Sequence, residues 1–240
     1  MTIIRKSLLI TIALAVSTSL PSQEPEAAKK QALQQRVTEL QESTAANRAK
    51  LQQYQWMETT EVDLKGKPKK TEQKLCRYGP DGKIEKTTLG SPPEPAKPRR
   101  GLKGRIVEKK VGELKDYMER LKSLIGEYVP PSREKIQEVF KAGHASMNPA
   151  SGGIASLVLN DYYKPGDTVI FAFDTAAKNI KSFAVNTYLD DPKNDVVTLS
   201  ASFMSLPDGT HYVGQTDLAS ASKHIEIKTV SSNYQKLSQQ

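Results

Sequence analysis

Alternation of apolar and polar residues dominates the second half of the chain. Between residues 154 and 230 apolar side chains recur at every second position, and short clusters rich in Gly, Pro, Asp and Asn separate the runs. This spacing is typical of antiparallel strands that bury one face. The pattern predicts strands near 154–160, 168–174, 180–189, 196–204, 211–217 and 224–230.

A shorter region of the same period precedes it. In YQWMETTEVDL, residues 54–64, four apolar side chains share one face with Glu58 and Thr60. The segments 69–78 and 83–89 follow, each preceded by turn residues, so we expect two further strands here. The four apolar residues on the shared face are Tyr54, Trp56, Val62 and Leu64.

The tripeptide Pro-Asp-Gly occurs twice, at 80–82 and 207–209, each time between alternating segments. Asp-Gly at such a place is a strong hairpin signal, because Gly adopts positive φ without steric cost. A calcium loop needs several oxygen ligands at fixed spacing, whereas Asp81 is followed by Lys83. We therefore predict a turn at both positions.

Helical spacing occupies the rest of the chain. Residues 26–54 contain apolar positions three and four apart with no Pro or Gly after Pro25. A second apolar stripe runs from Val107 to Tyr128, and Ser132 can cap a short third helix. Because a sheet with one apolar face must bury it, these helices are its expected cover. The predicted fold class is α+β, a curved antiparallel β-sheet (half-barrel or sandwich-like) covered by α-helices.

The N-terminus has the features of a cleavable export signal. Arg5 and Lys6 precede the apolar run 8–16, and small or polar residues follow. The run is too short to cross a bilayer of roughly 30 Å as a helix. Cleavage after Ser22 is expected, with Ser17 as an alternative, and the protein is predicted to be periplasmic or secreted.

These features divide the chain into three parts. Residues 1–22 are the predicted signal peptide, 23–53 an N-terminal helical segment, and 54–240 a single β-rich domain. Within that domain lie a Pro-rich, basic connector at 91–105 and a helical insertion at 106–142.

Charge is distributed unevenly. The formal net charge is +8, and residues 65–135 hold 20 Lys or Arg against 10 Asp or Glu. The connector has no interleaved aromatic residues, so an exported protein with this pattern is not expected to bind nucleic acid. Its basic side chains are candidates for contact with an anionic membrane surface, worth about 1 kcal/mol each; the alternative is a solvated loop. The candidates are Arg99, Arg100, Lys103 and Arg105.

Catalytic and metal-binding signatures are absent from the sequence. His144, His211 and His224 lie far apart without neighbouring ligands, so no metal site is predicted. The chain contains no nucleophile elbow, phosphate loop or dinucleotide fingerprint, so neither an enzyme nor a cofactor is predicted. Cys76 is the single cysteine; it can form no internal disulfide and lies far from any lipidation position.

The order of elements resembles the periplasmic lipoprotein carriers of the LolA/LolB-like type. The order is a helix, a strand pair, helices and a meander ending in HIEIKTVSSNY, and NRAKLQQYQWMETTEV is similar to that family's passage from helix into first strand. The resemblance implies an incomplete barrel whose apolar concave face, covered by helices, holds acyl chains. This chain departs from the family in its connector and N-terminal helix, and no site residue carries over. The stretches YQWMETTEVDLKGK, RYGPDGKIEKT and YYKPGD also resemble uncharacterised exported bacterial proteins.

Two functional hypotheses follow. The first is an exported binding protein that holds a lipid, a lipoprotein acyl chain or another apolar ligand between sheet and helices. The second is an envelope scaffold or partner-binding module with a closed core and no ligand. For the first, the candidate pocket residues are Trp56, Phe171, Phe173, Phe183, Leu199 and Phe203.

Overall fold

The computed structural model describes residues 45–90 and 102–237, with the single positions 31, 38 and 42. The predicted signal peptide and most of the predicted N-terminal helical segment lie outside the described residues, as do Arg99 and Arg100. The described residues 45–51 are helical, as predicted.

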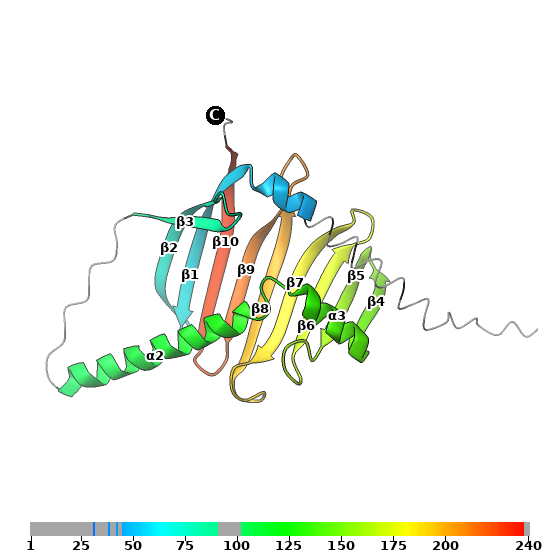
Figure 1. Cartoon of the computed structure of the whole chain (residues 1–240). Coiled ribbons are helices and arrows are strands. Elements are labelled where there is room, and N and C mark those ends of the chain that lie inside the picture. The colour runs from blue at the N-terminus through cyan, green and yellow to red at the C-terminus, as the bar shows by residue number, and fades with distance from the viewer. Residues whose placement is uncertain (1–30, 32–37, 39–41, 43–44, 91–101, 238–240) are drawn as a thin grey trace, which may run out of the picture.

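Ten strands form one antiparallel sheet in the described part of the chain, in the order β3-β2-β1-β10-β9-β8-β7-β6-β5-β4 (Figure 1). The chain builds β1 to β3 at one side, crosses through two helices to the opposite edge, and returns as a meander until β10 pairs with β1. The strands are β1 Tyr54–Leu64, β2 Lys67–Tyr78, β3 Ile84–Leu89, β4 Ala145–Ser151, β5 Ile154–Asn160, β6 Thr168–Asp174, β7 Asn179–Tyr188, β8 Val196–Ser205, β9 His211–Ser220 and β10 Ile225–Lys236.

Two helices, α2 (Leu102–Gly126) and α3 (Arg133–Ala142), lie across one face of this sheet (Figure 1). The predicted cap of α3 is confirmed, because the Ser132 side chain accepts a hydrogen bond from the Lys135 N–H. Gly143, at φ 78°, ends the helix in the left-handed conformation that glycine adopts most easily.

Helix and sheet side chains form one hydrophobic core on the face that carries the helices. The fold class is therefore the predicted one, a helix-covered antiparallel sheet. The buried members of this core include Tyr117, Leu121, Leu124, Tyr128, Ile136, Val139 and Phe140 of the helical region, and Leu157, Leu159, Val169, Phe171, Phe183, Val185, Val197, Leu199 and Ile225 of the sheet.

The structure corrects two sequence predictions. Strand β4 was not predicted, because Pro149 and the two glycines after Ser151 indicate a turn. Since β4 is an edge strand, its proline removes no hydrogen bond that an inner strand would need. Helix α2 begins at Leu102, so residues 102–105 are helical and do not belong to the connector.

Both Pro-Asp-Gly segments are hairpin turns, as predicted. Gly82 connects β2 to β3 at φ 72°, and Gly209 connects β8 to β9 at φ 79°. In each turn the aspartate side chain accepts the backbone N–H two residues later, at 2.9 Å for Asp81 and 3.0 Å for Asp208. The repeated tripeptide therefore serves the same local geometry twice.

No helix in the described ranges combines the length and the apolar content needed to cross a membrane.

Candidate functional site

The face of the sheet that carries the helices has two parts. We call the part formed by β5 to β8 and covered by α2 and α3 the filled half. Phe171, Phe183 and Leu199 lie here, each between 5% and 7% exposed, in one cluster with the buried helix side chains. Phe173 and Phe203 are half-buried against the same cluster. These five predicted pocket residues thus lie in space that helix side chains occupy.

Two tyrosines of the α2 region attach it to the loops of the filled half. The Tyr128 hydroxyl donates to Asp167 Oδ2 at 2.5 Å, and the Tyr117 hydroxyl donates to Asp195 Oδ1 at 2.8 Å. Burial is the main cause that raises the pKa of both hydroxyls above the usual value. Tyr117 lies within α2 and Tyr128 two residues after its end, and their hydroxyls reach the β7–β8 and β5–β6 loops at the same end of the sheet.

Asp167 is itself held in place by the backbone. It is 1% exposed and accepts N–H groups of Tyr162, Tyr163 and Lys164 at 2.6, 3.0 and 2.9 Å. A buried carboxylate with this many donors is fully satisfied. The hydrogen bond from Tyr128 therefore fixes the end of the helical region to a rigid turn.

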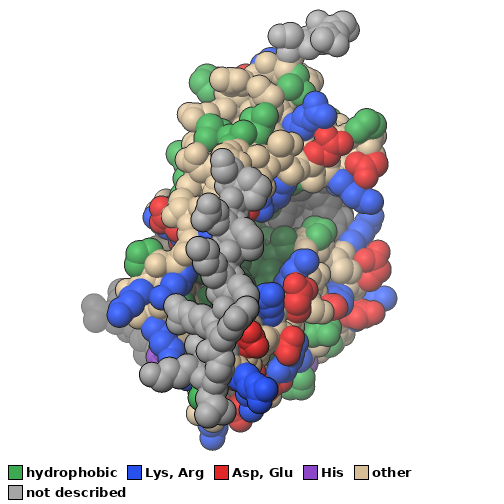
Figure 2. Space-filling model, turned by 90° about the vertical axis from the view of Figure 1, so that its left-hand side faces the viewer, with side chains coloured by type: hydrophobic (Ala, Val, Ile, Leu, Met, Phe, Trp, Pro, Cys, Tyr) green, Lys and Arg blue, Asp and Glu red, His purple; other side chains and the backbone are tan. Residues whose placement is uncertain are grey.

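The same face of β1, β2, β3 and β10, together with the adjoining part of β9, forms what we call the open half. Figure 2 looks at the molecule from this side and shows a hollow with hydrophobic side chains deep inside and charged side chains around its opening. Register identifies the residues that face it: Val62 pairs with Ile227, and Leu64 with Ile225. Ile225 belongs to the buried core, so its partners lie on the same face.

The apolar floor of the open half continues the core. Leu64, Leu218 and Ile227 of the sheet, with Leu114 and Met118 of α2, pack against the core cluster but stay half-buried. These side chains keep part of their surface accessible although residues of α2 lie among them. They make an apolar surface that a ligand can reach.

A polar band crosses the open half next to this floor. Glu58 of β1 accepts hydrogen bonds from Lys86 Nζ of β3 at 2.6 and 2.8 Å, and its side chain is only 14% exposed. Glu72 pairs with Lys70 and Lys74, each at 3.3 Å, and the Lys74 contact is the main cause that lowers the Glu72 pKa. Across the β1–β10 pair, Thr60 and Thr229 join hydroxyls at 3.1 Å.

Aromatic side chains close the far end of the band. Trp56 stacks on Tyr234, with ring centroids 5.5 Å apart and an interplanar angle of 10°. Tyr78 and Tyr212 extend this cluster, at 5.7 Å from Trp56 and 4.3 Å from Tyr234. Cys76, paired in register with Trp56, is fully buried, and burial raises the pKa of its thiol. Trp56 is thus the one predicted pocket residue on the open half.

The helical segment 45–51 lies at the aromatic end of the sheet (Figure 1). Asn47 makes two hydrogen bonds with the backbone of His211: its Nδ2 donates to the carbonyl at 2.6 Å, and its Oδ1 accepts the N–H at 2.7 Å. Arg48 donates to the Gly82 carbonyl at 2.6 Å, and the Tyr54 hydroxyl donates to Asp208 at 2.6 Å. Both Pro-Asp-Gly turns are therefore tied to the same short stretch of chain.

The residues predicted to contact an anionic membrane surface are only partly described. Arg105 is exposed on α2, and Lys103 belongs to the same helix. Arg99 and Arg100 lie outside the described residues.

The sequence identified the shared face of β1, whereas the other candidate pocket residues, on β6 to β8, pack in the core cluster with helix side chains. The signal for the open half was present, because Glu58 and Thr60 interrupt an otherwise apolar face. Leu218 and Ile227 alternate with polar residues like the other apolar strand residues, so the sequence does not distinguish them from residues that become part of the closed core. Among the described residues, no group of three or more His, Cys, Asp or Glu side chains is placed to hold a metal ion.

The arrangement places an apolar surface beside fixed charges. No protein-family model matches the chain, and no curated protein matches it in sequence.

Proposed function

We propose that the protein is an exported binding protein that holds an amphipathic, lipid-like ligand in the open half. The single observation that carries this proposal is the adjacency of the half-buried floor (Leu64, Leu218 and Ile227) and the polar band around Glu58 and Lys86. An acyl chain against the floor gains about 25 cal/mol per Å² of apolar area removed from water. A polar head group lies against the band, where paired charges and hydroxyls replace its water.

The filled half sets the position of the ligand. Because helix side chains occupy the space above Phe183 and Leu199, the ligand lies beside α2 and not beneath it. Leu114 and Met118 of α2 form one wall, and the aromatic cluster at Trp56 closes the opposite end. Helices beside an apolar concave face are also what the LolA/LolB-like resemblance implies.

Export is part of the proposal. The arrangement of Arg5, Lys6 and the apolar run 8–16 supports it. Expressed in a Gram-negative host, the protein is expected in the periplasmic fraction without at least its first 16 residues. Full-length protein in the cytosol would contradict export without bearing on the ligand.

The ligand is tested by extraction. Protein purified without detergent is expected to release lipid into organic solvent, identified by mass spectrometry. Ile227→Asp is expected to remove the lipid while leaving a cooperative thermal transition, because a carboxylate on a half-buried surface keeps contact with water. Phe183→Asp is expected to unfold the protein, because the same charge is then buried in the filled half.

Two matched variants serve as controls. Lys228→Ala, on the opposite face of β10, and Ile227→Val, which keeps the apolar surface, are both expected to retain the lipid. Absence of lipid from the unaltered protein, or full retention in Ile227→Asp, would overturn the binding proposal. The remaining candidate is then a scaffold or partner-binding module, which the closed packing of the filled half favours.

A further inference from the structure

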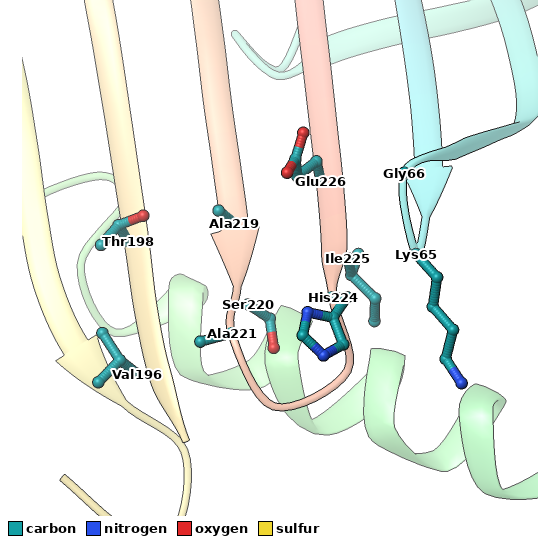
Figure 3. A pocket seen from close by; sticks show the side chains of 10 residues that line it. All are labelled: Lys65, Gly66, Val196, Thr198, Ala219, Ser220, Ala221, His224, Ile225 and Glu226. Carbon is teal, nitrogen blue, oxygen red and sulfur yellow. The ribbon is translucent and has the colours of Figure 1, made fainter. Parts of the chain in front are cut away.

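A second cavity lies at the hairpin end of the sheet and is lined mainly by residues of the outer face, with Ser220 and Ile225 from the helix side. It has a volume of about 600 Å³ and lies where the β1–β2 and β9–β10 hairpins meet the start of β8 (Figure 3). Figure 3 shows α2 behind the strands, so most of the pocket lies on the face opposite the open half. Cavities of roughly 300–1,000 Å³ are the usual size for small-molecule sites.

The pocket contains two residues with unusual backbone geometry. Lys65 (φ 56°) and His224 (φ 50°) both have the left-handed conformation, and the Lys65 N–H donates to the His224 carbonyl at 2.8 Å. For residues with a side chain this conformation is unfavourable, and Gly or Asn adopts it more easily. Lys65 and Gly66 form a two-residue hairpin loop in which Asn-Gly is the favoured pair.

Residues other than Gly that adopt an unfavourable backbone conformation are often found where a side chain contacts a ligand. Here both strained residues line one pocket, and both carry nitrogen atoms that can donate hydrogen bonds to an anion. Neither Lys65 nor His224 takes part in an ion pair among the described residues. Their side chains are therefore available to a bound molecule.

The remaining walls limit what fits. Val196, Ala219 and Ala221 give a short apolar surface, and Glu226 places one negative charge above His224 (Figure 3). Ser220 forms a rigid wall, because it is 2% exposed and its hydroxyl contacts the Tyr117 hydroxyl at 2.5 Å. The Glu226 carboxylate repels every negative charge on a ligand, so its effect is weakest for a single charge and grows with each further one.

We propose that this pocket binds a small monocarboxylate. Its charged end lies against Lys65 and His224, and its short aliphatic body lies against Val196 and the two alanines. Glu226 makes the site select against phosphate and dicarboxylates. The site is independent of the ligand proposed for the open half.

The probes are acetate, butyrate and hexanoate, with inorganic phosphate and succinate as competitors. Added to the full chain, butyrate is expected to shift backbone amide resonances of residues 65, 66 and 219–226 in a saturable way, while phosphate and succinate shift them at least tenfold more weakly. Short acids are used because they give little apolar contact with the open half. Shifts spread over β1 and β2 instead, or equal shifts with phosphate, would overturn the proposal.

Lys65→Asn and His224→Asn provide the sharper test. Each relieves backbone strain, so the unliganded variant is expected to melt about 2–4 °C higher, yet each is expected to bind butyrate at least tenfold more weakly. Lys67→Asn, an exposed lysine two residues away that does not line the pocket, is expected to change neither property. A gain in melting temperature with unchanged butyrate binding would show that the strain serves no ligand and would refute the site.

Discussion

The filled half and the open half present the same alternation of side chains and differ in how α2 passes over them. In the filled half the inward residues of β5 to β8, such as Leu159 and Val197, have no exposed surface. In the open half Leu64 and Ile227 have the same orientation but stay half-buried. Alternation therefore decides which face points inward, whereas the path of a helix decides whether that face becomes a core or an accessible surface.

Helix α2 shows the same contrast along its own length. Leu121, between the two tyrosines that attach the helical region, is 1% exposed, whereas Val111 is 48% and Ile106 is 56% exposed. Tyr117 and Tyr128 hold only the second part of the helix against the sheet. Along α2, packing is thus concentrated over the filled half, whereas the open half is held by the aromatic cluster around Trp56 together with hydrogen bonds and ion pairs.

The largest expected effect tests this concentration directly. Leu121→Ala is expected to reduce the free energy of unfolding by about 2–5 kcal/mol, because it leaves a cavity in a closed core. Val111→Ala, in the same helix, is expected to change it by less than about 0.5 kcal/mol. Urea unfolding of both variants measures the difference. Similar losses would mean that α2 contributes uniformly along its length.

The strands themselves were predictable because their signals are local. Segments 154–160 and 168–174 match β5 and β6 to the residue, since apolar alternation is bounded by turn residues on both sides. The edge strand β4 was missed because Pro149 is tolerated only at an edge, and edge position depends on the whole topology.

The site was less predictable because it depends on contacts between distant parts of the chain. Tyr117 and Asp195 are 78 residues apart, and Asn47 and His211 are 164 apart. No periodicity in either partner signals these pairs. The predicted pocket residue Phe183 lies on the expected face, but a sequence does not reveal which part of that face the helices fill.

A smaller effect is expected where the chain closes the end of the open half. Asn47→Ala removes both hydrogen bonds to the His211 backbone, so a loss of about 1–3 kcal/mol is expected. The His211 amide is expected to exchange its hydrogen faster, while amides of β5 and β6 are unaffected. Asn47→Asp keeps the acceptor and loses the donor, so it should be intermediate. Faster exchange throughout the sheet in Asn47→Ala would contradict a local role.

The smallest effect concerns the hydrogen bond between Tyr54 and Asp208, which joins the aromatic cluster to the second Pro-Asp-Gly turn. The Tyr54 hydroxyl is the main cause that lowers the Asp208 pKa from its usual 3.8 to about 2. A carboxyl group whose pKa is lowered by folding stabilises the fold above its usual pKa, and that contribution is lost as the pH falls from about 4 to about 2.

Trp56, the only tryptophan, lies in the same aromatic cluster and reports the change by fluorescence. We expect a small emission change with a midpoint near pH 2, which moves toward 3.8 in Tyr54→Phe and disappears in Asp208→Asn. Far-ultraviolet circular dichroism should stay constant through this change, because the filled half does not depend on Asp208. An unaltered fluorescence transition in Asp208→Asn would assign it to another carboxylate of the open half, such as Glu72, whose pKa is also lowered.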